Sequence, residues 1–179
     1  ATSGVLNVSA PTGRMNFNGS TLAAGSHLVL SAAEAFNASV STVSAGGNLT
    51  VTGGGTGNGS VNADNTTFGA GGVLSLSGVN AGGGVGMALF SGMQLVGSSV
   101  LLSGTSASGT GFVANAPTGT ITATSGPVSI TGRGPAGPAV QFTGGFAVQA
   151  PNQIDIHTDN GLSLQDRKST RLNSSHRLT

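Results

Sequence analysis

The chain repeats one short pattern of apolar and polar positions. In residues 70–78 a corner of small residues, Ala-Gly-Gly, precedes Val-Leu-Ser-Leu-Ser, where apolar and hydroxyl residues alternate before a closing glycine. Alternation with a period of two is typical of a β-strand that is buried on one face. The same pattern recurs along the chain, closely or loosely, at residues 4–10, 24–32, 45–53, 97–104, 126–132 and 160–164.

The spacing of these copies predicts a stacked repeat. Their first core-facing residues follow one another at similar intervals, and they are Leu6, Leu28, Leu49, Leu74, Val100, Val128 and Leu162. The last interval is the longest, and Ile154 offers an intermediate strand at the more usual distance from Val128. Repeats of about 20–30 residues are typical of solenoids, propellers and arrays. One unit has too little apolar surface to fold alone, so stacking must supply the core.

Parallel stacking places equivalent residues of successive coils above one another, about 4.8 Å apart. We expect Leu, Val and Ile to point inward, Ser, Thr and Asn to point outward, and Gly and Asn to form corners that need a positive φ. Residues 33–36 are the only candidate for a helix, and they are too few to stand alone. Phe68, Phe90 and Phe112 are evenly spaced along the chain, which predicts an aromatic column through neighbouring coils.

Composition favours ordered β-structure. The chain has 32 glycines among 179 residues, 6% charged residues and no Cys, Trp or Tyr. Gly, Ser, Thr and Asn are mediocre or poor helix formers, which excludes a helical protein. So much Gly and Ser is also typical of a disordered, low-complexity linker, but the recurrent apolar pairs, low charge and mean hydropathy of +0.19 argue against one. Without Cys there is no disulfide framework and no thiol chemistry.

The last fourteen residues break the pattern. Residues 166–176 contain neither glycine nor strand alternation, and they resemble the translation of a common short-read sequencing adapter. We interpret residues 166–179 as a disordered sequencing artefact; the alternative is a basic tail that binds nucleic acid or an anionic surface. Residues 1–165 carry two basic and four acidic side chains, a net charge of −2, whereas residues 166–179 carry four basic and one acidic, a net charge of +3.

The repeats in residues 45–52 and 70–77 resemble those of filamentous haemagglutinin-type exoproteins and related bacterial adhesins and autotransporter passengers. The resemblance extends more loosely over residues 1–165, although the spacing is irregular and Asp and Lys are few. It implies an all-β fold, a right-handed parallel β-helix, here of about seven irregular coils. With no initiator Met and no signal-peptide pattern at its start, we expect residues 1–165 to be a fragment of a larger exoprotein.

The resemblance also implies a function: a non-catalytic structural shaft or binding segment, secreted or exposed on the bacterial cell surface and associated with the outer membrane. The implied partners are an outer-membrane transporter for export and a glycan or protein on a host or neighbouring cell, contacted through other parts of the full protein. The export route stays open between two-partner secretion and a fused autotransporter barrel. We expect no cofactor and no nucleic-acid partner.

One predicted strand carries candidate metal ligands. Asp155, His157 and Asp159 share one face of this strand, and Ile154 and Ile156 share the other. Two carboxylates and an imidazole could bind a divalent metal. The alternative, which we favour, is the polar outer face of a half-buried strand, because no further ligands cluster nearby.

A glycan-active β-helix enzyme is the alternative function. Its site would need carboxylates that converge with one another, or with Arg or Lys. The candidates lie in separate repeats, and only stacking could bring them together: Arg14, Glu34, Asp64 and Arg133. In an enzyme, acidic and basic side chains of different coils should meet in one groove, whereas in a shaft they need not. We expect no catalytic residue.

Overall fold

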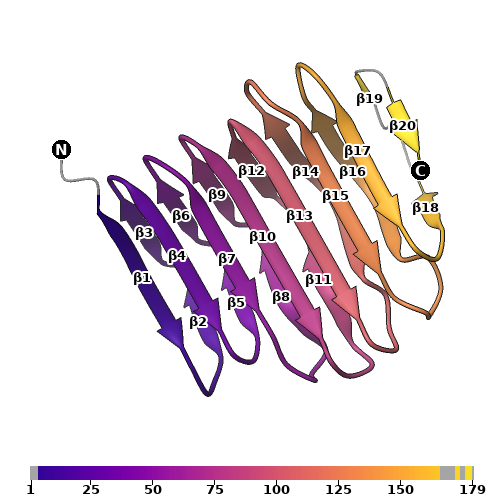
Figure 1. Ribbon diagram of the computed structural model, residues 1–179, viewed down its shortest axis with the longest axis horizontal. Coiled ribbons are helices and arrows are strands. Elements are labelled where there is room, and N and C mark those ends of the chain that lie inside the picture. Colours follow the sequence, from indigo (N-terminus) through magenta and orange to yellow (C-terminus); the bar gives the residue numbers. More distant parts are fainter. Residues whose placement is uncertain (1–3, 166–171, 174–175, 179) are drawn as a thin grey trace.

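The computed structural model describes residues 4–165, 172–173 and 176–178, and within them every regular element is a β-strand. The strands wind into a parallel β-solenoid, which confirms the predicted fold, with about six turns where the repeats predicted about seven. In Figure 1 the near strands run down the page, the far strands run up, and the chain advances from left to right, so the coil is right-handed. Within these residues no helix is long and apolar enough to cross a membrane.

One side of the solenoid is an eight-stranded parallel sheet, which faces the viewer in Figure 1. Its strands, in spatial order, are β1 (Val5–Ala10), β4 (His27–Ala32), β7 (Leu49–Gly53), β10 (Val73–Asn80), β13 (Ser99–Ser106), β15 (Val128–Arg133), β17 (Ile154–Thr158) and β20 (His176–Leu178).

A twelve-stranded parallel sheet forms the far side, and each coil crosses it in two segments that meet at a corner. The first segments are β2 (Met15–Asn18), β5 (Phe36–Ser39), β8 (Gly59–Asp64), β11 (Val85–Leu89) and β18 (Leu162–Gln165). The second segments are β3 (Thr21–Ala24), β6 (Thr42–Ala45), β9 (Thr67–Ala70), β12 (Met93–Gly97) and β19 (Leu172–Asn173). Two longer strands run through both segments, β14 (Phe112–Ala123) and β16 (Val140–Gln149).

The predicted column of core-facing residues is confirmed except at its last member. From one strand to the next, the eight-stranded sheet pairs Leu6, Leu28, Leu49, Leu74, Val100, Val128 and Ile154. The prediction of Leu162 for this column is wrong, because Leu162 lies in β18 of the other sheet and pairs with Val140. The members from Leu28 to Val128 are fully buried, whereas Leu6 in the first coil is 44% exposed.

Residues 33–36 form no helix, as their small number predicted, whereas the expected aromatic column is wrong at Phe90. Phe36 begins strand β5, and no helix forms there. Phe90 lies on the surface, 39% exposed, whereas the rings that do stack are buried or half-buried. The ring centroids of Phe17 and Phe36 are 5.5 Å apart, and those of Phe112 and Phe142 are 5.6 Å apart. Because coil length varies, even spacing along the chain does not keep a side chain on one face.

A column of buried glycines marks the edge at which the two sheets converge. Successive strands of the eight-stranded sheet place Gly53, Gly78, Gly104 and Gly132 in register. A Cβ atom on Gly78 would clash with the carbonyl oxygen of Gly86 in the facing strand, and one on Gly104 would clash with that of Gly111. Only glycine therefore lets the two backbones approach this closely.

The corner within the twelve-stranded sheet uses a left-handed backbone. The corner residues of four successive coils have φ angles of 60°, 50°, 45° and 67°, and they are Gly19, Val40, Asn65 and Gly92. Each donates its backbone N–H to a carbonyl oxygen of the next coil, as Val40 does to Asp64 at 3.1 Å. Glycine and asparagine tolerate this conformation, but valine does not do so readily.

Residues 166–179 are the tail that we interpret as a sequencing artefact, and within it the structure describes only strands β19 and β20. These strands pair with β16 and β17. The remaining residues of the tail lie outside the described part of the chain, so its interpretation as a sequencing artefact stays a prediction.

Candidate functional site

The predicted metal ligands lie on β17 and directly after it. Asp155 and His157 are on its outward face, and Asp159 follows the strand. Asp155 Oδ1 accepts a hydrogen bond from Gln153 Nε2 at 2.6 Å, and Asp159 Oδ1 accepts one from the backbone N–H of Gly134 at 3.1 Å. Among the described residues, no group of three or more His, Cys, Asp or Glu side chains is placed to hold a metal ion.

Stacking does bring two of the scattered charged residues together. Arg14 precedes β2 and Glu34 precedes β5 in the next coil, and Arg14 Nε lies 3.2 Å from Glu34 Oε2. Both side chains stay more than half exposed, so this ion pair contributes little to stability. Asp64 and Arg133 do not join them: Asp64 lines a neighbouring hollow at the end of β8, which Asn37 and Asn62 also line, and Arg133 lines one with His157 and Asp159.

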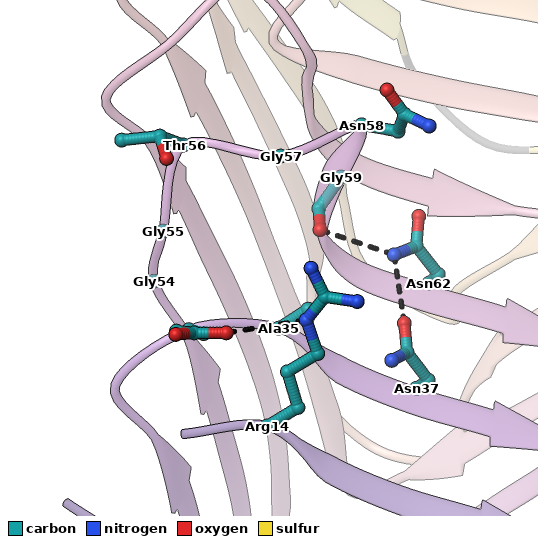
Figure 2. Close-up of a pocket in the computed structure, with 11 residues that line it drawn as sticks. Arg14, Ala35, Asn37, Gly54, Gly55, Thr56, Gly57, Asn58, Gly59 and Asn62 are labelled. Atoms are coloured by element: carbon teal, nitrogen blue, oxygen red, sulfur yellow. Dashed lines mark hydrogen bonds and ion pairs between the residues drawn. The ribbon is translucent and has the colours of Figure 1, made fainter. Parts of the chain in front are cut away.

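The Arg14–Glu34 pair lies in a groove of about 530 Å³, which we call the polar groove. Its lining comes from three coils: Arg14, Glu34, Ala35, Asn37, residues 54–59 and Asn62. Figure 2 shows the loop of residues 54–58 along one side, Asn37 and Asn62 on the other, and the Arg14 guanidinium between them. The groove therefore exists only because three coils are stacked.

An asparagine ladder forms one wall of the polar groove. Strands β2, β5 and β8 place Asn16, Asn37 and Asn62 in register on their outer face. Asn37 Nδ2 donates to Asn16 Oδ1 at 2.7 Å, and Asn62 Nδ2 donates to Asn37 Oδ1 at 2.9 Å and to the Gly59 carbonyl at 3.1 Å. These bonds hold the amide planes in one orientation before any ligand arrives.

The glycine-rich loop that connects β7 and β8 forms the opposite wall. Gly55 has a φ of +116°, which side chains rarely permit. A Cβ atom on Gly54 would lie 2.6 Å from the carbonyl oxygen of Ala33, and one on Gly59 would clash with the Asn62 amide. The absence of side chains therefore lets the loop lie against the coil before it and leaves its backbone accessible from the groove.

This groove could not be predicted from the repeats, in which Arg14 and Glu34 lie far apart along the chain. A signal was present, because Met-Asn-Phe, Phe-Asn-Ala and Val-Asn-Ala each place an asparagine between two apolar residues, at residues 15–17, 36–38 and 61–63. Only the coil register shows that the three asparagines adjoin.

The side chains that line the groove are mainly hydrogen-bonding groups. Among the described residues that line it, Glu34 supplies the only carboxylate, and Arg14 engages that carboxylate. Hydrolysis of a glycosidic bond normally uses two carboxyl groups, one as acid and one as base or nucleophile. Planar amides, a guanidinium and exposed backbone instead offer directional hydrogen bonds.

The fold defines the class of this protein as a parallel β-solenoid repeat protein. Comparison with known proteins matched no family model, no curated protein and no solved structure.

Proposed function

We propose that residues 1–165 form a non-catalytic shaft segment of a large bacterial adhesin, secreted or exposed at the cell surface, of the filamentous haemagglutinin or autotransporter type. The observation that supports this most is the in-register ladder of the eight-stranded sheet, which runs from β1 to β17. A ladder of this kind lengthens by adding coils without any change of architecture, which is what a shaft requires.

The mechanism of such a shaft is geometric. Each coil pairs its backbone with the coils before and after it, and the inward aliphatic residues stack into one continuous core. Bending the rod would break hydrogen bonds and open the core at the same point, so the stacked coils resist bending. A rod of this kind holds a recognition region away from the cell.

The partners of the shaft follow from the same proposal. An outer-membrane transporter would export the chain, and the adhesive contact would be with a glycan or protein on a host or neighbouring cell. Folding after export is compatible with a chain that has no cysteine, because its core needs no disulfide formation.

The two alternatives have less support. A low-complexity linker would leave the apolar pairs exposed, whereas residues such as Leu28, Leu49 and Leu74 are fully buried. A glycan-active enzyme requires acids and bases that meet in one groove, and Arg14 and Glu34 do meet. Their groove nevertheless has a single carboxylate among its described residues, which favours binding over hydrolysis.

Antibodies raised against the chain test this proposal on intact cells of the source bacterium. We expect them to label unpermeabilised cells or the culture medium, and to reduce attachment of the cells to host cells or to one another. Labelling that requires permeabilisation would contradict a secreted or surface shaft. Unchanged attachment despite surface labelling would contradict the adhesive role.

A further inference from the structure

We propose that the polar groove is a binding site for a neutral polyhydroxylated ligand, the sugar unit of an uncharged glycan. This inference deepens the adhesin proposal, because it assigns a recognition site to the shaft segment itself. The volume of about 530 Å³ falls within the range of small-ligand pockets, roughly 300–1,000 Å³. The ligand class follows from the charge, the hydrogen-bonding groups and the rigidity of the lining.

The charge of the groove favours a neutral ligand. Among its described lining residues, Arg14 is the only cation and Glu34 the only anion, and they lie 3.2 Å apart. An anionic ligand would meet the Glu34 carboxylate beside the guanidinium, and a cationic ligand would meet Arg14 beside the carboxylate. A neutral ligand encounters neither repulsion.

The hydrogen-bonding groups of the groove match vicinal hydroxyls, since each hydroxyl both donates and accepts. The ion pair engages the Nε of Arg14 and one oxygen of Glu34, which leaves the terminal nitrogens of Arg14 as donors and the second oxygen of Glu34 as an acceptor. Figure 2 shows the guanidinium directed into the groove, toward the side of Asn62 and Gly59. The fixed fork of a guanidinium can donate one hydrogen bond to each of two neighbouring hydroxyls.

The amide wall of the groove is already ordered. The amides of Asn37 and Asn62 are held by bonds of 2.9 Å or less along the ladder. On the facing wall, a Cβ atom on Gly57 would lie 3.9 Å from Arg14 Nη2, so the loop backbone is close enough to bond the same ligand. A site that is ordered in advance loses less entropy when it binds.

The charge and the amide ladder together distinguish this groove from the rest of the same sheet face. In register beyond Asn62, strand β11 carries Ala88 and strand β14 carries Val113. These side chains cannot continue the row of amides. The row of amides is therefore confined to the first three coils, so the site is not a surface that every coil repeats.

An array of immobilised neutral and acidic glycans, probed with the full chain, tests the proposal. We expect binding to neutral glycans, and at least a tenfold loss of affinity in the Arg14→Gln variant. The Arg133→Gln variant is the matched control, because Arg133 lies in another hollow and its loss should leave binding unchanged. The unfolding midpoint of Arg14→Gln should stay close to that of the unmodified chain, since the ion pair is exposed.

Three outcomes would overturn the inference: binding to acidic glycans only, equal binding by Arg14→Gln, or no binding to any glycan on the array by a chain that circular dichroism shows to be folded. Amide NMR spectra with the best neutral glycan locate the contact, and we expect shifts at residues 54–59. Shifts confined to another face would place the site elsewhere. Antibody labelling of intact cells tests the shaft proposal, and none of these glycan-binding results affects it. The two proposals can therefore fail independently.

Discussion

At the scale of single residues, this fold makes strict demands at a few backbone positions. Val40 occupies a corner at which the preceding and the next two coils place Gly19, Asn65 and Gly92. Its φ of 50° is costly for a β-branched side chain, by about 1–2 kcal/mol. The side chain is 58% exposed, so little burial offsets this strain.

Replacing Val40 with asparagine should therefore stabilise the protein. We expect Val40→Asn to raise the unfolding midpoint by roughly 2–4 °C for each kcal/mol of strain removed. Thermal unfolding followed by circular dichroism checks this. Val79→Asn is the matched control, because Val79 is 52% exposed within strand β10 and has no positive φ. A higher unfolding midpoint in both variants, or in neither, would argue against backbone strain at Val40.

The buried glycines at the edge where the two sheets converge also leave no room for a side chain. Gly78→Ala would place a methyl group against the Gly86 carbonyl, and forcing the two backbones apart should cost about 1–3 kcal/mol or more, the typical effect of overpacking. Denaturant unfolding measures the loss. Gly69→Ala is the control, since the nearest atom to its new Cβ would be 3.9 Å away, and we expect a neutral or slightly stabilising effect there. Equal losses of unfolding free energy in Gly78→Ala and Gly69→Ala would contradict the idea that close approach of the two sheets sets the cost.

At the scale of elements, side chains on neighbouring strands act as connected rows. The asparagine ladder joins β2, β5 and β8 through bonds between side chains, in addition to the backbone bonds of the sheet. Asn37, in the middle, makes two of these bonds, and Asn16, at the end, makes one.

The loss of stability on removing one asparagine side chain should depend on how many ladder hydrogen bonds that side chain makes. We expect Asn37→Ala to lower the free energy of unfolding by about 1–3 kcal/mol and Asn16→Ala by about half as much, because a hydrogen bond contributes roughly 0.5–1.5 kcal/mol. Denaturant unfolding of both variants and the double variant checks this. Additive effects of equal size would contradict coupling along the row.

At the scale of the whole molecule, stability comes from contacts between neighbouring coils. Leu76 is fully buried in a central strand, β10, where its partners in register are Val51 and Leu102. In a stack of repeats each unit depends on its neighbours, so damage in one coil should weaken the adjoining coils first.

Truncating this central residue tests that dependence. Leu76→Ala should cost about 2–5 kcal/mol, typical of a cavity in a core. Leu101→Ala is the control on the adjoining strand β13, and since Leu101 is 40% exposed we expect a loss within about 0.5 kcal/mol. Hydrogen exchange should show loss of protection in β7 and β13 before β1 and β17. Uniform loss along the rod would contradict a nearest-neighbour stack.

The all-β class, the parallel stacking and most of the inward column follow from the order of the amino acids alone. Alternating residues such as Leu74-Ser75-Leu76 can bury only one face, and their recurrence at coil-length intervals leaves stacking as the way to cover it. These conclusions rest on the alternation of apolar and polar residues within a strand and on the spacing of the repeats along the chain. Both are visible in the sequence without any three-dimensional distance.

Which residues of different coils adjoin depends on how the coils pack in three dimensions. Coils vary in length, and the variation is taken up in loops and corners. Sequence spacing therefore offered both Ile154 and Leu162 after Val128, and only the register shows that Ile154 continues the column. For the same reason sequence spacing could not place Phe90 on the surface or bring Arg14 beside Glu34. The polar groove combines side chains of three coils, and its geometry depends on register, which is set when the sheets pack and not by the alternation within one strand.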